Sequence, residues 1–197
     1  AGADVNKATT DNGYTPLYLV AEEGHLAVVA KLIAAGADVN KATTDDDTTP
    51  LYIAAEKDHL TVVTKLIAAG ALVDKALTTD GRTPLFTAAG NGHLAVVMKL
   101  IAAGADVDKA KTDTGATPLF MAAQEGHLTV VTKLIAAGAD VNKATTDDGT
   151  TPLYIAAQNG HLAVVTKLIA AGALVDKAKT TSGSTPLFMA AQEGHTA

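Results

Sequence analysis

The sequence contains no cysteine and no tryptophan, and its aromatic residues are four tyrosines and three phenylalanines among 197 residues. Without cysteine, the chain can form no disulfide, thiol nucleophile or thiolate metal site. Long apolar runs are also absent, because stretches such as LIAAGA fall well short of the roughly 20 residues that a membrane-spanning helix needs. The sequence therefore predicts neither a transmembrane helix nor chemistry at a thiol.

Positive charge is scarce as well, with 15 lysines and arginines against 21 acidic residues and a formal net charge of −6. Nucleic-acid binding depends on clustered basic residues that neutralise phosphates, whereas the basic residues of this chain are spread at regular intervals. The same distribution disfavours an anionic membrane surface. The hydrophobic content of 48% is sufficient for a real core, so we expect a folded protein without a nucleic-acid or membrane partner.

The dominant pattern is an internal repeat. The tripeptide Thr-Pro-Leu recurs with a period of 34 residues, and its threonines are Thr15, Thr49, Thr83, Thr117, Thr151 and Thr185. A fixed period of this length is typical of solenoid proteins. We expect one repeat solenoid over residues 1–197, with units 1–34, 35–68, 69–102, 103–136, 137–170 and a truncated unit 171–197.

Each unit is predicted to contain two short helices. Thr151 is suited to cap the first helix and Pro152 to occupy its first position, and we expect that helix to run to about Asn159. The segment HLAVVTKLIAA follows as a second helix, with Gly160 and Gly172 in positions that end the two helices. Helical spacing places an apolar stripe along the second helix at Leu162, Val165, Leu168 and Ile169.

Helices this short are marginal alone, so each pair must bury its apolar stripe against neighbouring pairs. The connecting segment GADVNKATTDDGTTPL carries turn residues at its centre, where Gly149 can adopt positive φ and the aspartates can bond their own backbone. We therefore expect a hairpin-like finger loop between successive units.

A unit with these features resembles the ankyrin repeat, which combines a turn with two helices and carries the signature T-P-L-H-x-A. The resemblance covers the whole chain and implies an all-α repeat solenoid. This chain differs from the usual unit of about 33 residues by one extra residue, which alignment places in the finger between Asn142 and Thr151. It also has an aromatic residue where the signature has histidine, namely Tyr18, Tyr52, Phe86, Phe120, Tyr154 and Phe188. We favour interlayer packing for this aromatic row over a stacking platform for bases or sugars.

Six histidines, one per unit, raise the possibility of a metal site. Adjacent helical layers are roughly 8 to 10 Å apart, whereas two zinc ligands must each lie about 2 Å from the ion. We therefore expect these imidazoles to satisfy backbone groups at turns and helix ends.

The acidic clusters at Asp45–Asp47 and at Asp147 and Asp148 lack the spacing of an EF-hand, which favours turn chemistry. A row of lysines is expected on a solvated helix face, at Lys31, Lys65, Lys99, Lys133 and Lys167.

Catalysis requires unlike groups that converge at one place, whereas a repeat places like groups in parallel rows. We therefore predict that the chain is not an enzyme and uses no cofactor or metal.

The ankyrin resemblance implies a scaffold that binds a protein partner in a concave groove, and it favours an intracellular location. Alignment assigns the groove to fingertip and first-helix positions that vary between copies: Tyr14, Glu22, Glu23, Asp46, Glu56, Lys57, Arg82, Asn91, Asp113, Gln124, Glu125, Asp148, Gln158 and Asn159. Substitutions at the fingertips are expected to leave stability unchanged.

An alternative function is structural. The outer helix positions carry alanine and threonine in place of charge, and both chain ends should expose apolar layer surface, so copies of the chain could associate end to end or side by side. Thr196 stands where other units have leucine, and Phe188 and Met189 are expected to lack a shielding helix.

The second repeat, residues 35–68, should also be the least stable layer. Asp47 and Asp58 replace glycines at positions where we expect positive φ.

Overall fold

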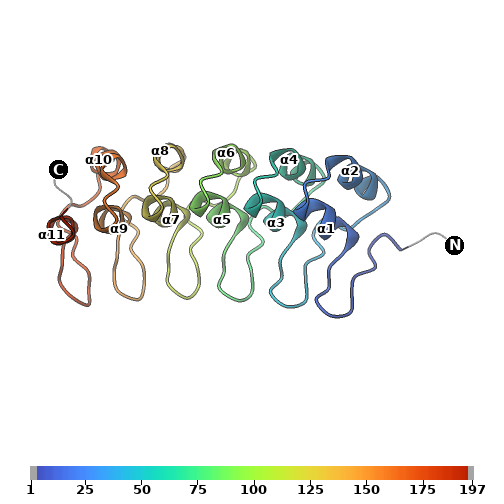
Figure 1. Ribbon diagram of the computed structural model, residues 1–197, viewed down its shortest axis with the longest axis horizontal. Coiled ribbons are helices and arrows are strands. Elements are labelled where there is room, and N and C mark those ends of the chain that lie inside the picture. The colour runs from blue at the N-terminus through green and yellow to red at the C-terminus, as the bar shows by residue number, and fades with distance from the viewer. Residues whose placement is uncertain (1–3, 195–197) are drawn as a thin grey trace. The chain divides into compact units, whose positions relative to one another are not determined.

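The computed structural model describes residues 4–194, and within this range it contains eleven α-helices and no strand. Helices of seven and nine residues alternate along the chain (Figure 1). The first helices of the repeats are α1 (Pro16–Glu22), α3 (Pro50–Glu56), α5 (Pro84–Gly90), α7 (Pro118–Gln124), α9 (Pro152–Gln158) and α11 (Pro186–Gln192). The second helices are α2 (Leu26–Ala34), α4 (Leu60–Ala68), α6 (Leu94–Ala102), α8 (Leu128–Ala136) and α10 (Leu162–Ala170). None of these helices is long and apolar enough to cross a membrane.

The chain divides into two compact units, one made of residues up to 88 with 95–105, and the other of residues 89–94 with 106 onward. In the first unit, α1 packs on α2 and α3, while α4 packs on α2 and α3. In the second, α9 contacts α7, α10 and α11, while α8 contacts α7 and α10. Within each unit the first helices form a row beside the finger loops, and the second helices form a row on the far side (Figure 1).

The helix boundaries follow from local sequence, as predicted. The Thr151 hydroxyl oxygen accepts a hydrogen bond from the backbone N–H of Tyr154 at 3.1 Å, and Pro152 begins the helix. The helix ends at Gln158, one residue before the predicted end, and Gly160 follows with φ 73°. Gly172 ends the second helix in the same manner, with φ 90°.

The core consists of the leucines of the first five Thr-Pro-Leu copies, Leu17, Leu51, Leu85, Leu119 and Leu153, and of the inward side of each second helix. In α10 the buried residues are Val164 and Leu168, which are four positions apart. The predicted apolar stripe was therefore wrong at Leu162, which is 54% exposed. Leu162 is the first residue of its helix, and the buried side of α10 is the one that carries Val164 and Leu168. The stripe was also wrong at Ile169, which is exposed, while Val165 is half-buried.

The aromatic row is packed between layers, which confirms the packing interpretation for its described members other than Phe188. Tyr18, Tyr52 and Tyr154 are buried. Burial raises the pKa of the Tyr52 phenol above its usual value, because the charged form would lose its hydration. The hydroxyl groups reach the next repeat: that of Tyr52 lies 2.7 Å from the Thr87 Oγ1, and that of Tyr154 lies 2.9 Å from the Ser184 Oγ. Phe188 differs, because it is exposed.

Three histidines bond backbone carbonyl groups of the preceding repeat, which confirms their structural role. The Nε2 atom of His59 lies 2.9 Å from the carbonyl oxygen of Glu22, and that of His161 lies 2.9 Å from the carbonyl oxygen of Gln124. His127 makes the same contact with Gly90 at 3.0 Å. Each contact satisfies a carbonyl at the end of a first helix, where no intrahelical donor is present. His195 and Thr196 lie outside the described residues.

The fingers are hairpin loops, as expected, and backbone hydrogen bonds join successive fingers. The N–H of Thr145 donates to the carbonyl oxygen of Thr150 at 2.9 Å and closes one finger. The N–H of Thr146 donates to the carbonyl oxygen of Thr114 in the preceding finger at 2.8 Å. At the finger base, the Asn142 side chain accepts from the N–H of Leu174 at 2.8 Å and donates to the carbonyl oxygen of Gly172 at 3.3 Å. These bonds fix the position of this finger relative to its two neighbours in the second unit.

The second repeat contains the backbone irregularity expected from its sequence. Asp47 has φ 64° and Asp58 has φ 60°, and no other non-glycine residue of residues 4–194 has positive φ. At Asp47 an ion pair partly offsets the cost of the left-handed backbone, because the Asp47 carboxylate lies 2.8 Å from the ammonium group of Lys75.

Candidate partner-binding surface

The candidate surface comprises the finger loops and the first helices beside them, and we refer to it as the finger surface. In the second unit this surface contains a groove of about 340 Å³ that spans three successive repeats. Its apolar part comes from Phe120, Met121 and Ile155 on α7 and α9. Polar side chains surround that part: Lys111, Gln124, Thr145, Asp147, Asp148, Gln158 and Lys179 are among them.

The electrostatic centre of this groove is Asp148. Its carboxylate accepts hydrogen bonds from the Thr145 hydroxyl at 2.9 Å, from the Thr150 N–H at 3.0 Å and from the Thr150 hydroxyl, and it forms an ion pair with Lys179. Burial alone would raise the pKa of Asp148, but the hydrogen bonds from Lys179 and the two threonines outweigh burial and hold it well below the usual value. Asp148 is therefore ionised at neutral pH and linked to the following finger through Lys179.

Asp46 has the same role in the first unit. Its carboxylate accepts from the Thr43 and Thr48 hydroxyls at 2.7 and 2.6 Å and from the Thr48 N–H at 3.0 Å. Burial alone would raise the pKa of Asp46 too, but the hydrogen bonds from Thr48 and Thr43 lower the pKa below its usual value. The carboxylates of Asp46 and Asp148 hold the turns of their own fingers, so for these two fingertips we now expect substitution to lower stability, in contrast to the expectation from sequence.

The other fingertip candidates are also paired. The Arg82 Nε donates to the Asp80 carboxylate at 2.7 Å, and Asp113 lies 3.2 Å from the Lys111 ammonium group. Tyr14 is half-buried and stacks on Tyr18, with ring centroids 4.6 Å apart.

The candidates at the ends of the first helices are more accessible. The exposed ones are Glu23, Lys57, Asn91, Glu125 and Asn159, while Glu22, Glu56, Gln124 and Gln158 are half-buried. The Asn159 amide donates to the Gln124 carbonyl oxygen at 2.9 Å, so α9 and α7 are linked at this end. The Gln124 amide donates to the Glu125 carboxylate at 2.9 Å.

Of the predicted residues, the structure brings Gln124, Asp148 and Gln158 together in the groove of the second unit. The candidates Tyr14 to Arg82 lie in the first unit, and Asn91, Asp113, Glu125 and Asn159 lie in the second outside the groove lining. Sequence reasoning missed Lys111, Thr145 and Lys179. These three occupy one repeat position that varies between copies, so the variation that indicated the fingertips could have indicated them as well.

Within residues 4–194, no three histidine, cysteine, aspartate or glutamate side chains gather in an arrangement suited to a metal ion. The fingertip carboxylates of Asp46, Asp80, Asp113 and Asp148 bond lysine, arginine or threonine side chains. The chemistry of the finger surface is that of a surface with a small apolar floor and fixed polar side chains around it, which is a common composition for a protein-binding patch.

Comparison with known protein families agrees with this geometry. A family profile described as ankyrin repeats (3 copies) matches residues 1–76, 69–145 and 141–197. The chain therefore belongs to the ankyrin repeat family, and its fold is an all-α repeat solenoid. Ankyrin repeats generally mediate protein–protein interactions, and proteins built from them are typically non-catalytic scaffolds. A search of curated proteins gives no match to the chain.

Proposed function

We propose that this chain is a non-catalytic scaffold that binds a protein partner through its finger surface. The observation that supports the proposal is the groove over α7 and α9, where an apolar floor is combined with polar side chains from three successive repeats. The finger residues around this floor differ between copies, as expected if each repeat contributes a different contact. We further propose that residues 1–197 act as a single domain in this binding, without a cofactor, nucleic acid or membrane.

The charge of the groove indicates what a partner must offer. Lys111 and Lys179 stand beside Asp147 and Asp148, and both lysines already contact carboxylates. A partner that displaced these ion pairs would leave charges desolvated, which is costly. We therefore propose a partner that inserts an uncharged side chain over Phe120, Met121 and Ile155 and hydrogen-bonds the amide of Gln124.

The experiment is site-specific photo-crosslinking in the full chain. A photoreactive amino acid at Gln124 should capture a protein partner, and one at Lys133, on the exposed face of α8, should not. Gln124→Arg should remove binding without unfolding the chain, because the Gln124 side-chain amide donates to the exposed Glu125 carboxylate, while the Gln124 carbonyl oxygen still accepts from His161. If capture came from Lys133 alone, the finger surface would not be the binding site.

A structural role is the second candidate, in which copies of the chain associate end to end or side by side. It is favoured by exposed apolar residues in the first repeat and in the last: Leu19, Val28, Leu187 and Phe188. Contacts between two different surfaces of one protein lead to open chains if they do not close into a ring. Sedimentation velocity over a wide concentration range should then show growing species. A chain that stays monomeric at the highest concentration would eliminate this role.

A further inference from the structure

The first unit has a counterpart of the groove over α7 and α9, formed by its first two repeats and the finger that follows them. Every residue that lines the groove has a counterpart three repeats earlier in the sequence. The lining of the groove contains two lysines and two aspartates, so its formal charge is zero. The counterparts include four carboxylates and no lysine: Glu22, Asp45, Asp46 and Glu56, with Thr9 and Leu77 in place of the lysines. We refer to these four acidic residues together with Tyr18, the counterpart of Phe120, as the acidic site.

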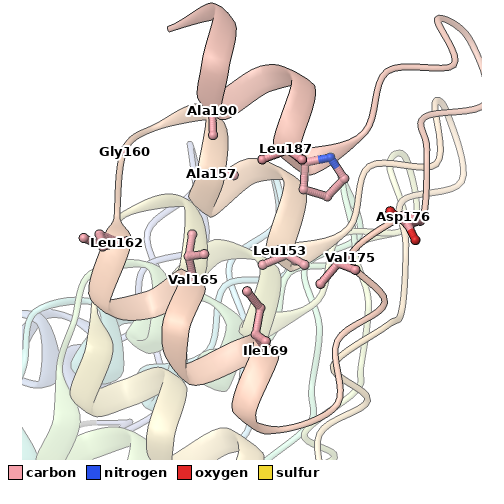
Figure 2. Close-up of a pocket in the computed structure, with 11 residues that line it drawn as sticks. Leu153, Ala157, Gly160, Leu162, Val165, Ile169, Val175, Asp176, Leu187 and Ala190 are labelled. Atoms are coloured by element: carbon pink, nitrogen blue, oxygen red, sulfur yellow. The ribbon is translucent and has the colours of Figure 1, made fainter. Parts of the chain in front are cut away.

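Two other hollows of the second unit show that such a concentration of carboxylates is not usual in this chain. The hollow between α9, α10 and α11 has a volume of about 430 Å³ and a mainly apolar lining, with Asp176 at its edge (Figure 2). The hollow between α9, α11 and the finger before α11 has no charged residue among the described side chains that line it. The acidic site therefore differs in charge from all three of these places.

A buried hydroxyl group at the acidic site lacks the partner that its counterparts have. Tyr18 is 6% exposed, and within residues 4–194 its hydroxyl group makes no hydrogen bond. The hydroxyl groups of Tyr52 and Tyr154 each bond a hydroxyl group of the following repeat. Because buried polar groups are nearly always hydrogen-bonded, the Tyr18 hydroxyl is a group that a bound partner can satisfy.

The repeat that follows Tyr18 explains the difference. At the position of Thr87 this repeat has Ile53, which has no polar group in its side chain. At the position of Ser184 it has Thr48, whose hydroxyl donates to the Asp46 carboxylate at 2.6 Å. Neither side chain bonds the Tyr18 hydroxyl.

The carboxylates of the acidic site act on this hydroxyl group. Burial raises the pKa of the Tyr18 phenol above its usual value. Negative charges close to the phenol raise the pKa further, and they belong to Glu22, Asp46 and Glu56. The hydroxyl group and these carboxylates therefore lie close enough together to act on one bound group, and that group must carry positive charge.

The second unit shows which group fits beside such a carboxylate. The Lys179 ammonium group pairs with Asp148 and lies 5.2 Å from the centroid of the Tyr154 ring. In the first unit Leu77 occupies the position of Lys179, so the following finger offers Asp46 no ammonium group there. The chain thus provides the cation for Asp148 itself and does not provide it for Asp46.

The basic residues of the neighbouring segments do not fill the acidic site. Arg82 pairs with Asp80 at 2.7 Å and interacts electrostatically with Glu56. Within the described part of the chain, Glu22 and Asp46 form no ion pair. No three acidic side chains of residues 4–194 gather closely enough for a metal ion, whereas the N–H groups of an organic cation point in several directions and can reach separate acceptors.

We propose that the acidic site binds a lysine side chain of the protein partner, with its ammonium group between the Glu22 and Asp46 carboxylates and donating to the Tyr18 hydroxyl oxygen. The inference rests on the proposed function, because a partner on the finger surface supplies this lysine. The partner then offers an uncharged side chain to the groove of the second unit and a lysine to the acidic site of the first.

The probe is Nα-acetyl-lysine methylamide, which carries the lysine side chain without a free α-amino or carboxyl group. The full chain is labelled with tyrosine that carries carbon-13 at Cζ, which gives one signal for each of the four tyrosines, and Tyr18→Phe assigns the signal of Tyr18. At constant ionic strength the Tyr18 signal should move with saturation at a Kd on the order of 10 mM, as expected for one side chain. The Tyr154 signal should stay in place. The same compound acetylated at Nε, which has no charge, should leave the Tyr18 signal unchanged.

Two variants of the full chain form a matched pair. Glu22→Gln introduces the residue found at its counterpart Gln124 and should weaken probe binding about threefold or more. Glu23→Gln removes the same charge from an exposed neighbour whose counterpart Glu125 does not line the groove. It should bind the probe as well as the original chain does. Circular dichroism should show the same helical signal for both variants.

The proposal is overturned if the Tyr18 signal does not respond to the probe, or if the uncharged compound moves it equally. It is also overturned if Glu22→Gln and Glu23→Gln bind the probe equally well, because the attraction is then diffuse. Displacement of the probe by calcium chloride at the same ionic strength would show a metal site instead. Photo-crosslinking at Gln124 does not involve the acidic site. Failure of crosslinking alone therefore contradicts the proposed function, and failure of probe binding alone contradicts this inference.

Discussion

Replacing Gly126 with alanine tests how the layers of the second unit are joined. Gly126 follows α7 with φ 75°, and a Cβ atom added to it would lie 2.6 Å from the Nδ1 atom of His161. Gly138 follows α8 with φ 92°, but a Cβ atom there would have no neighbour within 4 Å. The two glycines thus share the backbone requirement and differ in the imidazole contact, so Gly138→Ala is the matched control.

The expected magnitudes follow from these distances. The left-handed backbone costs an alanine roughly 1 kcal/mol at either position. At Gly126 the imidazole must also move, and it then loses its hydrogen bond to the Gln124 carbonyl oxygen, which contributes about 1 kcal/mol more. Gly126→Ala should therefore lower the free energy of unfolding by about 2 kcal/mol and Gly138→Ala by about 1 kcal/mol.

Urea unfolding followed by far-ultraviolet circular dichroism measures both values, provided that the slope with urea concentration is unchanged. A double-mutant cycle with His161→Ala then isolates the imidazole contact. In the His161→Ala background, Gly126→Ala should cost only the backbone contribution, equal to that of Gly138→Ala. The reasoning is refuted if the two glycine variants are equally destabilised, or if Gly126→Ala costs the same with and without His161.

Two further predictions concern pH and local stability. The folded-state pKa of Asp148 is depressed by Lys179 and two threonines, so its stabilising contribution is present above the unfolded pKa of about 4 and is lost as pH falls through the lower folded pKa. The melting temperature should therefore fall less steeply on acidification in Asp148→Asn than in the original chain. An unchanged slope in Asp148→Asn would contradict this assignment. In hydrogen exchange, amides of residues 47–60 should open before those of residues 149–162, because Asp47 and Asp58 adopt positive φ where the other window has Gly149 and Gly160. Equal protection of the two windows would show that the second repeat is not the least stable layer.

Sequence reasoning succeeded where the determinants are local. Thr151, Pro152 and Gly160 fix the ends of a helix through their own backbone and side-chain chemistry, so the positions of the helices could be predicted within one residue. The family assignment followed from the same repeated residues. Leu162 was placed wrongly because the side of a short helix that becomes buried depends on neighbouring layers, and helical spacing does not specify those layers.

The finger surface was predictable only in part. Variation between copies indicated the fingertips as candidate contact positions, but it gave no information on how their side chains are paired. Lys179 and Asp148 belong to different repeats, so the ion pair between them is not visible in the sequence of either repeat alone. The exposure of Leu187 likewise depends on what lies beside α11 and not on the leucine itself, which is identical to the buried Leu153.

The histidine contact described above has a consequence for how such a chain can change length. His59 and His161 each contact a carbonyl group 37 residues earlier, and the Lys177 ammonium group reaches the Asn142 carbonyl 35 residues earlier. A repeat that makes these contacts supplies a donor to the repeat before it and an acceptor to the repeat after it. Recombination that adds or removes 34 codons within the array therefore leaves each donor opposite an acceptor. A gene of this kind can lengthen or shorten without any compensating substitution at the new junction.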